Sequence, residues 1–262
     1  MLSRCRVVLV RPHYAGNVGS AARVMRNFGL TDLVLVAPVA NVQSLDATMM
    51  ATRGLPILKA ARVVPTFAEA VADCGWVLAT SGETGGVRRQ GFWGTPEEQV
   101  PAVLRALADA PVAIVFGPEP SGLTVPEIAA CHAMTFIPAD PEYQSLNLAQ
   151  AVAVVLYELH KQYLKLGPQP MAAAGDVPAG FADQERMFAK LKEALVAVRF
   201  LWDFRGDGIF HVLRQVISRG RPTKKEVAVF HGLAGQLSYI ARRHAVVHPR
   251  DGRPPPGADD GT

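Results

Sequence analysis

Cysteine and long apolar runs are both scarce in this chain of 262 residues. The three cysteines, Cys5, Cys74 and Cys131, lie far apart, form no C-x-x-C pair and are too few for a disulfide framework. The apolar run after Arg6 contains only four residues before Arg11 interrupts it, which is too short for a signal peptide or a membrane span. These absences predict a protein of the reducing cytoplasm without a membrane-spanning segment.

The spacing patterns of metal sites and dinucleotide sites are also missing. The seven histidines show no metal-ligand spacing with one another or with cysteine, so no metal is expected. The glycines after the first predicted strand read Gly16-x-x-Gly19, which is neither the G-x-G-x-x-G of dinucleotide-binding turns nor a P-loop. No acidic residue closes the second predicted strand as a ribose partner would. These patterns argue against a nucleotide-dependent oxidoreductase.

Hydrophobic residues make up 49% of the chain, enough for one sizeable core and a second small one. The net charge of +4 is unevenly distributed. Residues 181–262 contain 14 Lys and Arg against 9 Asp and Glu, whereas residues 1–180 contain 13 against 14. The positive excess therefore lies at the C-terminal end, where it predicts either a surface for a polyanion such as RNA or a solvated helical face.

Short apolar runs alternate with helix-like segments over the first two thirds of the chain. The predicted strands are residues 5–10, 32–37, 62–64, 76–80, 112–116 and 134–137. The predicted helices are residues 18–28, 67–72, 96–108, 126–132 and 149–166. The strands are β-branched and apolar without clean alternation, which is typical of a parallel sheet covered on both faces. Residues 1–166 are therefore predicted to form an α/β domain.

The remainder of the chain has a different composition. Residues 167–180 are rich in Pro, Gly and Ala and are predicted to be a linker. Helical spacing at residues 181–204, 208–219 and 224–243 predicts a small all-helical domain over residues 181–245. Residues 246–262 are rich in Pro and Gly and are predicted to be disordered.

Polar or glycine-rich segments follow several predicted strands. Residues 117–124 and 81–86 come directly after a strand, and residues 141–149 lead into the most apolar helix. Asn17 and Arg23 are expected at and just inside a helix start, where an arginine can meet a phosphate or an activated oxygen. Since α/β sheets bind ligands at the carboxyl ends of their strands, these segments predict a ligand site. The alternatives are structural turns, a capped core helix and a surface ion pair of Arg23.

Three ordered motifs carry a family resemblance: Gly16-Asn17-Val18-Gly19-Ser20-x-x-Arg23, Phe116-Gly117-Pro118-Glu119-x-x-Gly122-Leu123, and Ile137-Pro138 followed after six residues by Gln144-Ser145-Leu146-Asn147-Leu148-Ala149. Together they resemble the motifs of the SpoU branch of SPOUT RNA 2′-O-ribose methyltransferases. The preceding Pro141-Glu142-Tyr143 most resembles the TrmJ subfamily, and the basic helical extension with its Arg219-Gly220-Arg221-Pro222 turn is similar as well.

This resemblance implies an S-adenosylmethionine-dependent methyltransferase with a SPOUT α/β domain that ends in a trefoil knot. It also implies a homodimer that methylates the ribose of cytidine or uridine in tRNA, at anticodon-loop nucleotide 32. The implied cofactor-binding residues are Thr80, Ser81, Gly82, Gly117, Ile137, Gln144, Ser145 and Leu146. The implied catalytic residues are Asn17, Arg23, Glu119, Ser145 and Asn147, with Arg23 facing the cofactor of the other protomer.

The basic side chains of the helical domain form the predicted RNA-binding surface, which comprises Arg214, Arg219, Arg221, Lys224, Lys225, Arg242 and Arg243. In the first domain, Pro118 and Pro120 flank Glu119 where family members often carry basic or polar residues, so neither position is expected to contact RNA.

The proposed reaction needs a deprotonated ribose 2′-hydroxyl. A guanidinium keeps its proton far above neutral pH and is a poor base. Arg23 is therefore predicted to stabilise the developing alkoxide. The sequence leaves the base open among a water, a phosphate oxygen and a perturbed Arg23. Two further functions also stay open: a ribosomal RNA 2′-O-methyltransferase, and an RNA-binding protein without catalysis.

Overall fold

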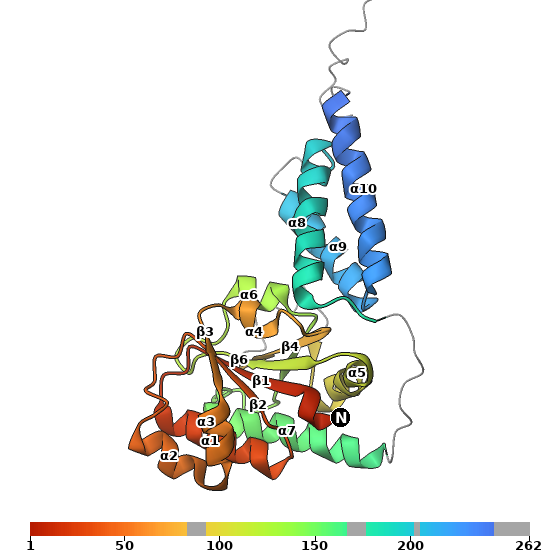
Figure 1. The fold of residues 1–262 in the computed structure, drawn as a ribbon. Helices are drawn as coiled ribbons and strands as arrows, with labels where there is room; N and C mark the ends of the chain where they lie inside the picture. Colours follow the sequence, from red (N-terminus) through yellow and green to blue (C-terminus); the bar gives the residue numbers. More distant parts are fainter. Residues whose placement is uncertain (83–92, 167–176, 202–204, 244–262) are drawn as a thin grey trace, which may run out of the picture. The chain divides into compact units, whose positions relative to one another are not determined.

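A computed structural model describes residues 1–82, 93–166, 177–201 and 205–243 (Figure 1). The chain divides into two compact units, Met1–Phe181 and Ala182–Thr262. The segment predicted to be disordered, residues 246–262, lies outside the described residues, as do residues 167–176 of the predicted linker and residues 83–86 of the predicted glycine-rich loop. Within the described ranges, no helix is long and apolar enough to cross a membrane.

The first unit is built on a parallel sheet. Its strands are β1 (Cys5–Val10), β2 (Asp32–Val36), β3 (Arg62–Val64), β4 (Trp76–Ser81), β5 (Trp93–Gly94), β6 (Val112–Phe116) and β7 (Ala133–Phe136). Their order across the sheet is β3-β2-β1-β6-β4-β7-β5, and all paired strands run parallel. The predicted parallel α/β sheet is thus confirmed, with one additional two-residue strand, β5, that was not predicted.

Helices cover both faces of this sheet (Figure 1). One face carries α1 (Ala15–Asn27), α2 (Leu45–Ala51), α3 (Leu55–Ala60), α5 (Pro96–Asp109) and α7 (Leu148–Lys165). The other face carries α4 (Phe67–Val71) and α6 (Val125–Ala130). Alternate residues of β1 therefore belong to two separate cores: Val7 and Leu9 pack with the first group of helices, and Val8 and Val10 with the second.

The main differences from the sequence predictions lie between β1 and β3. Helix α1 begins at Ala15 rather than at residue 18, so Asn17 stands in its first turn. Helices α2 and α3 and the 3-10 turn between them were not predicted, although the Ser44 hydroxyl caps α2 by accepting from Ala47 N. A Cβ on Gly19 would lie 2.0 Å from the Ala47 carbonyl oxygen, so α1 and α2 meet backbone to backbone.

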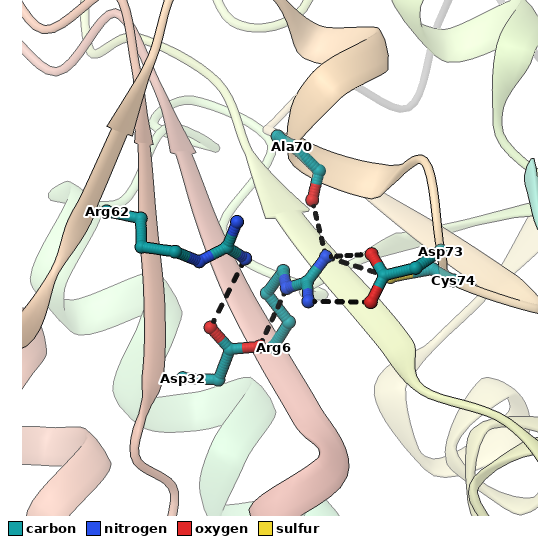
Figure 2. A network of polar contacts seen from close by, with 6 residues as sticks. All are labelled: Arg6, Asp32, Arg62, Ala70, Asp73 and Cys74. Atoms are coloured by element: carbon teal, nitrogen blue, oxygen red, sulfur yellow. Dashed lines mark hydrogen bonds and ion pairs between the residues drawn. The ribbon is translucent and has the colours of Figure 1, made fainter. Parts of the chain in front are cut away.

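Arg6, buried on β1, joins three segments at the amino edge of the sheet (Figure 2). Its guanidinium donates to Asp32 Oδ2 at 2.7 Å, to the Ala70 carbonyl at 2.7 Å and to both carboxylate oxygens of Asp73 at 2.6 and 3.1 Å. Arg62 makes a longer ion pair with Asp32, at 3.6 Å. Because a buried guanidinium cannot lose its proton, these acceptors are what makes its burial tolerable.

The last residues of the first unit pack against the turn that Arg6 binds. The Cys74 carbonyl accepts a hydrogen bond from Phe181 N at 2.9 Å, and the Phe181 ring lies edge-on to Phe67 at 6.0 Å. Ala179 is fully buried. Residues 178–180, the end of the segment predicted as a linker, therefore pack within the first unit.

The second unit contains three described helices, α8 (Phe181–Ala197), α9 (Gly206–Arg219) and α10 (Lys224–Arg243). Phe188 of α8 and Phe210 of α9 pack edge to face, with ring centroids 6.4 Å apart. Helix α8 ends earlier than the predicted residue 204, because Arg199 adopts a left-handed backbone with φ of 57°.

The ion pair of Asp73 predicts a pH dependence of stability. The Arg6 guanidinium holds the pKa of Asp73 below its ordinary value. A carboxylate whose pKa is lowered by folding stabilises the protein at neutral pH, and this contribution is lost as the pH falls through the folded-state pKa. Acidification below about pH 4 should therefore destabilise the wild type more than Asp73→Asn, which starts less stable.

Urea denaturation of the wild type and of Asp73→Asn between neutral and acidic pH measures this difference. Glu142→Gln, at an exposed position, is the control that removes a carboxylate without removing an ion pair of the described residues. Identical pH slopes in the wild type and Asp73→Asn would show that the Arg6 pair does not contribute.

Candidate active site

The polar segments gather at the carboxyl edge of the sheet. Strands β1, β6, β4 and β7 are neighbours in that order and run parallel, so the segments that follow them emerge side by side. The strand order also changes direction at β1, since β2 and β3 extend the sheet to one side and the later strands to the other. Such a switch point is where open α/β sheets bind their ligands.

Three predicted catalytic residues form one hydrogen-bond chain at this edge. Asn147 Nδ2 donates to Asn17 Oδ1 at 2.9 Å, and Asn17 Nδ2 donates to Glu119 Oε1 at 2.7 Å. The second carboxylate oxygen of Glu119 accepts from the backbone N–H of His13 at 2.9 Å. The structure thus brings together side chains that lie 130 and 102 positions apart in the sequence.

The chemistry of the end groups fixes the direction of this chain. An ionised carboxylate only accepts hydrogen bonds, so Asn17 must turn its amide NH2 toward Glu119 and its oxygen toward Asn147. At the other end, Asn147 Oδ1 accepts from Ala149 N at 2.9 Å and caps α7. Each asparagine uses one amide hydrogen in this hydrogen-bond chain and has a second amide hydrogen outside it.

A tight turn after β6 presents Glu119. The carbonyl of buried Pro118 accepts from Gly122 N at 2.9 Å, which folds the segment back on itself. A Cβ on Gly117 would lie 2.4 Å from Leu123 N, so only glycine fits at the start of this turn. The proline at position 118, where the resemblance led us to expect a basic or polar residue, therefore has a structural place inside the turn.

The predicted cofactor-binding residues occupy the ends of β6, β4 and β7. Thr80 Oγ1 donates to the Val115 carbonyl of β6 at 3.0 Å, and Ser81 pairs in register with Phe136 of β7. A Cβ on Gly82 would stand 3.7 and 3.8 Å from the Cα and Oγ atoms of Ser145, so the segments that follow β4 and β7 lie in contact.

This lining suits S-adenosylmethionine. Ile137 and Leu146 are half-buried and supply apolar surface, while the segments beyond the strand ends present backbone groups outside the sheet pairing. Gly82 has no side chain to fill the space beside Ser145. Ser145, which was also predicted to be catalytic, thus lies with the cofactor segments. Across the described residues, no group of three or more His, Cys, Asp and Glu side chains could hold a metal ion.

Arg23 does not join this cluster. It follows Asn17 by six residues on α1, and at 3.6 residues per turn its side chain points about 120° away from that of Asn17. The side chain is exposed, and within residues 1–82 and the other described ranges it makes no hydrogen bond or ion pair.

The predicted RNA-binding residues of the second unit fall into two groups. Arg214 forms an ion pair with Glu185 and lies over the Phe188 ring, 4.7 Å from its centroid, so its charge is committed inside the unit. Arg219 Nε donates to the Gln215 carbonyl, and Arg221 is half-buried. Arg219 is nevertheless exposed, and the other exposed basic side chains of the predicted set stand at the two ends of α10: Lys224, Lys225, Arg242 and Arg243.

Two features of the site were not found from the sequence. One is the His13 N–H that holds Glu119, which no side-chain pattern reveals because every residue except proline has this group. The other is a bidentate ion pair between Arg11 and Glu127, at 2.6 and 2.9 Å. The Thr124-x-x-Glu127 capping box was a readable signal for the start of α6, but it gave no sign of the arginine.

Comparison with known proteins finds relatives that are named as methylases or methyltransferases. The SpoU rRNA Methylase family matches residues 4–157. The tRNA (cytidine/uridine-2′-O-)-methyltransferase TrmJ of Klebsiella pneumoniae is 35% identical over 243 residues, covering 90% of this chain and 97% of the relative. The crystal structure of TrmJ from Z. mobilis ZM4 matches with a TM-score of 0.73 and 35% identity, over 88% of this chain and 98% of that one. A probable methylase family protein from Haemophilus influenzae matches with a TM-score of 0.58 and 31% identity, over 93% and 99%.

The parallel sheet, the polar chain at its carboxyl edge and these structural matches define a SPOUT-type α/β methyltransferase. The chain belongs to the SpoU rRNA Methylase family, and it is an S-adenosylmethionine-dependent methyltransferase. The predicted resemblance to the SpoU branch and to the TrmJ subfamily is therefore confirmed. The trefoil knot stays a prediction.

Asn147 has two functions that substitution can separate. Asn147→Asp keeps an oxygen to cap α7 and Asn147→Ala does not, so the free energy of unfolding should be about 1 kcal/mol lower in Asn147→Ala than in Asn147→Asp. Both variants lose the N–H donated to Asn17. This bond joins two neutral amides and contributes about 0.5–1.5 kcal/mol, so methyl transfer should slow by up to about tenfold in both variants.

Thermal or urea unfolding and single-turnover methyl transfer to undermodified total RNA measure the two effects. Asn27→Asp, at the exposed last residue of α1, controls for the added charge. Wild-type transfer rates in Asn147→Asp would show that the chain from Asn147 to Asn17 is not needed.

Proposed function

We propose that this enzyme methylates the ribose 2′-hydroxyl of cytidine or uridine in tRNA, at nucleotide 32 of the anticodon loop. The observation that carries the proposal is the joined set of Asn17, Glu119 and Asn147 at the carboxyl edge of the sheet. The relatives support the substrate class, since proteins similar to this chain over 90% of its length are named for methylation of cytidine and uridine in tRNA.

Each residue of the site has a proposed task. The cofactor, when bound, supplies an electrophilic methyl group, and the residues proposed to hold it are Thr80, Ser81, Gly82, Gly117, Ile137, Gln144, Ser145 and Leu146. Asn17 and Asn147 orient the ribose through their second amide hydrogens, while Glu119 fixes Asn17. Arg23 stabilises the developing alkoxide and holds a neighbouring phosphate.

Arg23 performs this task for a second copy of the chain. Its side chain points about 120° away from that of Asn17 on α1, which supports a site that takes Asn17 from one protomer and Arg23 from the other. Helix α7 offers an apolar surface for such pairing, since Val154, Tyr157 and Leu164 are exposed along it. The protein is therefore proposed to act as a homodimer with composite sites.

The second unit is proposed to bind the tRNA backbone. Four exposed basic residues form two pairs on α10, Lys224 with Lys225 and Arg242 with Arg243. Corresponding members of the pairs are 18 positions apart, which places them on the same face of the helix, about 27 Å apart. Contacts of this type go to phosphates, so the affinity for tRNA should fall with salt. Arg214 is left out of this surface because it pairs with Glu185.

The function is tested by transferring labelled methyl from S-adenosylmethionine to undermodified total RNA and mapping the modified nucleotide. We expect label in tRNA, on the ribose of nucleotide 32. Label in ribosomal RNA would discard tRNA as the substrate but keep the chemistry. Cofactor binding with no label in any RNA would favour a protein that binds RNA without catalysis.

Complementation between protomers tests the proposed role of Arg23. Homodimers of Arg23→Ala and of Glu119→Gln should both be nearly inactive, because every site in them lacks one required residue. A heterodimer of the two variants has one site with both residues intact, and should transfer methyl at about half the wild-type rate.

The heterodimer is isolated by two different affinity tags, and its single-turnover rate is compared with both homodimers. Arg26→Ala, which removes an exposed arginine one turn further along α1, is the matched control and should retain the wild-type rate. A heterodimer as inactive as its parents would show that Arg23 serves its own chain.

A further inference from the structure

A bidentate ion pair lies next to the hydrogen bonds of Glu119. Arg11 follows the last residue of β1, and its two terminal nitrogens bond to the two carboxylate oxygens of Glu127 at 2.6 and 2.9 Å. The Glu127 side chain is only 13% exposed and that of Arg11 34%. The same arginine lowers the pKa of Glu127, so the carboxyl stays ionised at neutral pH.

The backbone at Arg11 is unfavourable for an arginine. Its φ is 45°, in the left-handed region that favours glycine, and its N–H donates to the Val36 carbonyl at 2.8 Å. Glycine would take this conformation without strain. The arginine side chain must therefore contribute something that offsets the strain, and within the described residues its partner is Glu127.

The ion pair and the Glu119 hydrogen bonds join the same two segments of the chain. Residues 11–17 carry Arg11, the His13 N–H and Asn17, while residues 119–127 carry Glu119 and Glu127. Glu127 is itself fixed at the start of α6, because its Oε2 atom accepts from Thr124 N at 2.8 Å. The ion pair and the Glu119 hydrogen bonds are therefore two separate interactions that set the distance between the segment after β1 and the turn after β6.

We propose that Arg11 and Glu127 are positioning residues, whose ion pair holds the turn after β6 so that Glu119 can accept from both His13 N–H and Asn17. Neither residue contacts reacting atoms. Their effect on the reaction passes through Glu119, and in this respect the inference rests on the proposed function. The placement of Glu119 is measurable without any reaction.

Two variants break the pair in different ways. Glu127→Gln keeps the capping box of α6, because glutamine also serves at that position, but it loses the charge and one of the two bonds to Arg11. Arg11→Gly removes the pair and relieves the backbone strain, so loss of function would not follow from a poorer backbone. The matched control is Glu69→Gln at the start of α4, where the Thr66 hydroxyl accepts from Glu69 N and donates to its carboxylate, and where no arginine of the described residues pairs with the glutamate.

Hydrogen exchange of the His13 amide is the first readout. We expect its exchange to be at least tenfold faster in Glu127→Gln and in Arg11→Gly than in the wild type and in Glu69→Gln. The second readout is single-turnover methyl transfer at saturating tRNA and cofactor, which should fall at least tenfold in the same two variants. The dissociation constants for S-adenosylmethionine and tRNA should stay within twofold of the wild type.

The outcomes separate this inference from the proposed function. Unchanged His13 exchange in both variants overturns the positioning role, whatever the transfer rates are. Faster exchange with unchanged transfer also overturns it, because Glu119 would then not need the pair. If the wild type methylates no RNA, the proposed function fails, while the exchange of His13 still shows whether Arg11 and Glu127 hold Glu119.

Discussion

The hydrogen-bond chain from Asn147 through Asn17 to Glu119 is the constraint on which the active centre depends. It forms only if the segments after β1, β6 and β7 emerge at one edge of the sheet, which the parallel order of these strands ensures. It is also directional, because a carboxylate at one end and a helix N–H at the other leave each amide a single orientation. Side chains from three distant parts of the sequence are thereby fixed without a metal or an ion pair within the chain of bonds.

Strand β1 is braced at both of its ends by an arginine and acidic partners. At the amino edge Arg6 is deeply buried and is matched by Asp32 and Asp73, which ties β1 to β2 and to the turn before β4 (Figure 2). At the carboxyl edge Arg11 is matched by Glu127 of α6. Asp32 and Asp73 neutralise the buried guanidinium of Arg6. The pair of Arg11 and Glu127 is partly exposed to solvent and lies at a turn with strained backbone. A strand at the centre of the sheet is thus coupled to helices on the face opposite α1 at both ends.

The sequence predicted the strands and the grouping of Asn17, Glu119 and Asn147 better than it predicted the connections. Strands such as residues 112–116 are continuous β-branched or apolar runs that a buried parallel sheet requires, so their pattern is unambiguous. Helices α2 and α3 were missed because they are short, and a turn with φ of 45° at Thr52 interrupts any helical period. The hydrogen bond from His13 to Glu119 uses a backbone N–H, which no side-chain pattern reveals. The ion pair of Arg214 with Glu185 depends on how α8 and α9 pack. Interactions of this kind become visible only when the chain is folded.

The charge distribution also follows from the chemistry of the site. The Glu119 carboxylate lies at the carboxyl edge of the sheet, and its partners among the described residues are the neutral N–H groups of His13 and Asn17. A polyanionic substrate would be repelled by such a site unless positive charge stood elsewhere on the protein. Residues 1–180 carry a net charge of −1 and residues 181–262 a net charge of +5. This distribution fits the proposed function, in which the basic helices and Arg23 attract an RNA substrate while the first unit orients Asn17 and Asn147 around the Glu119 carboxylate.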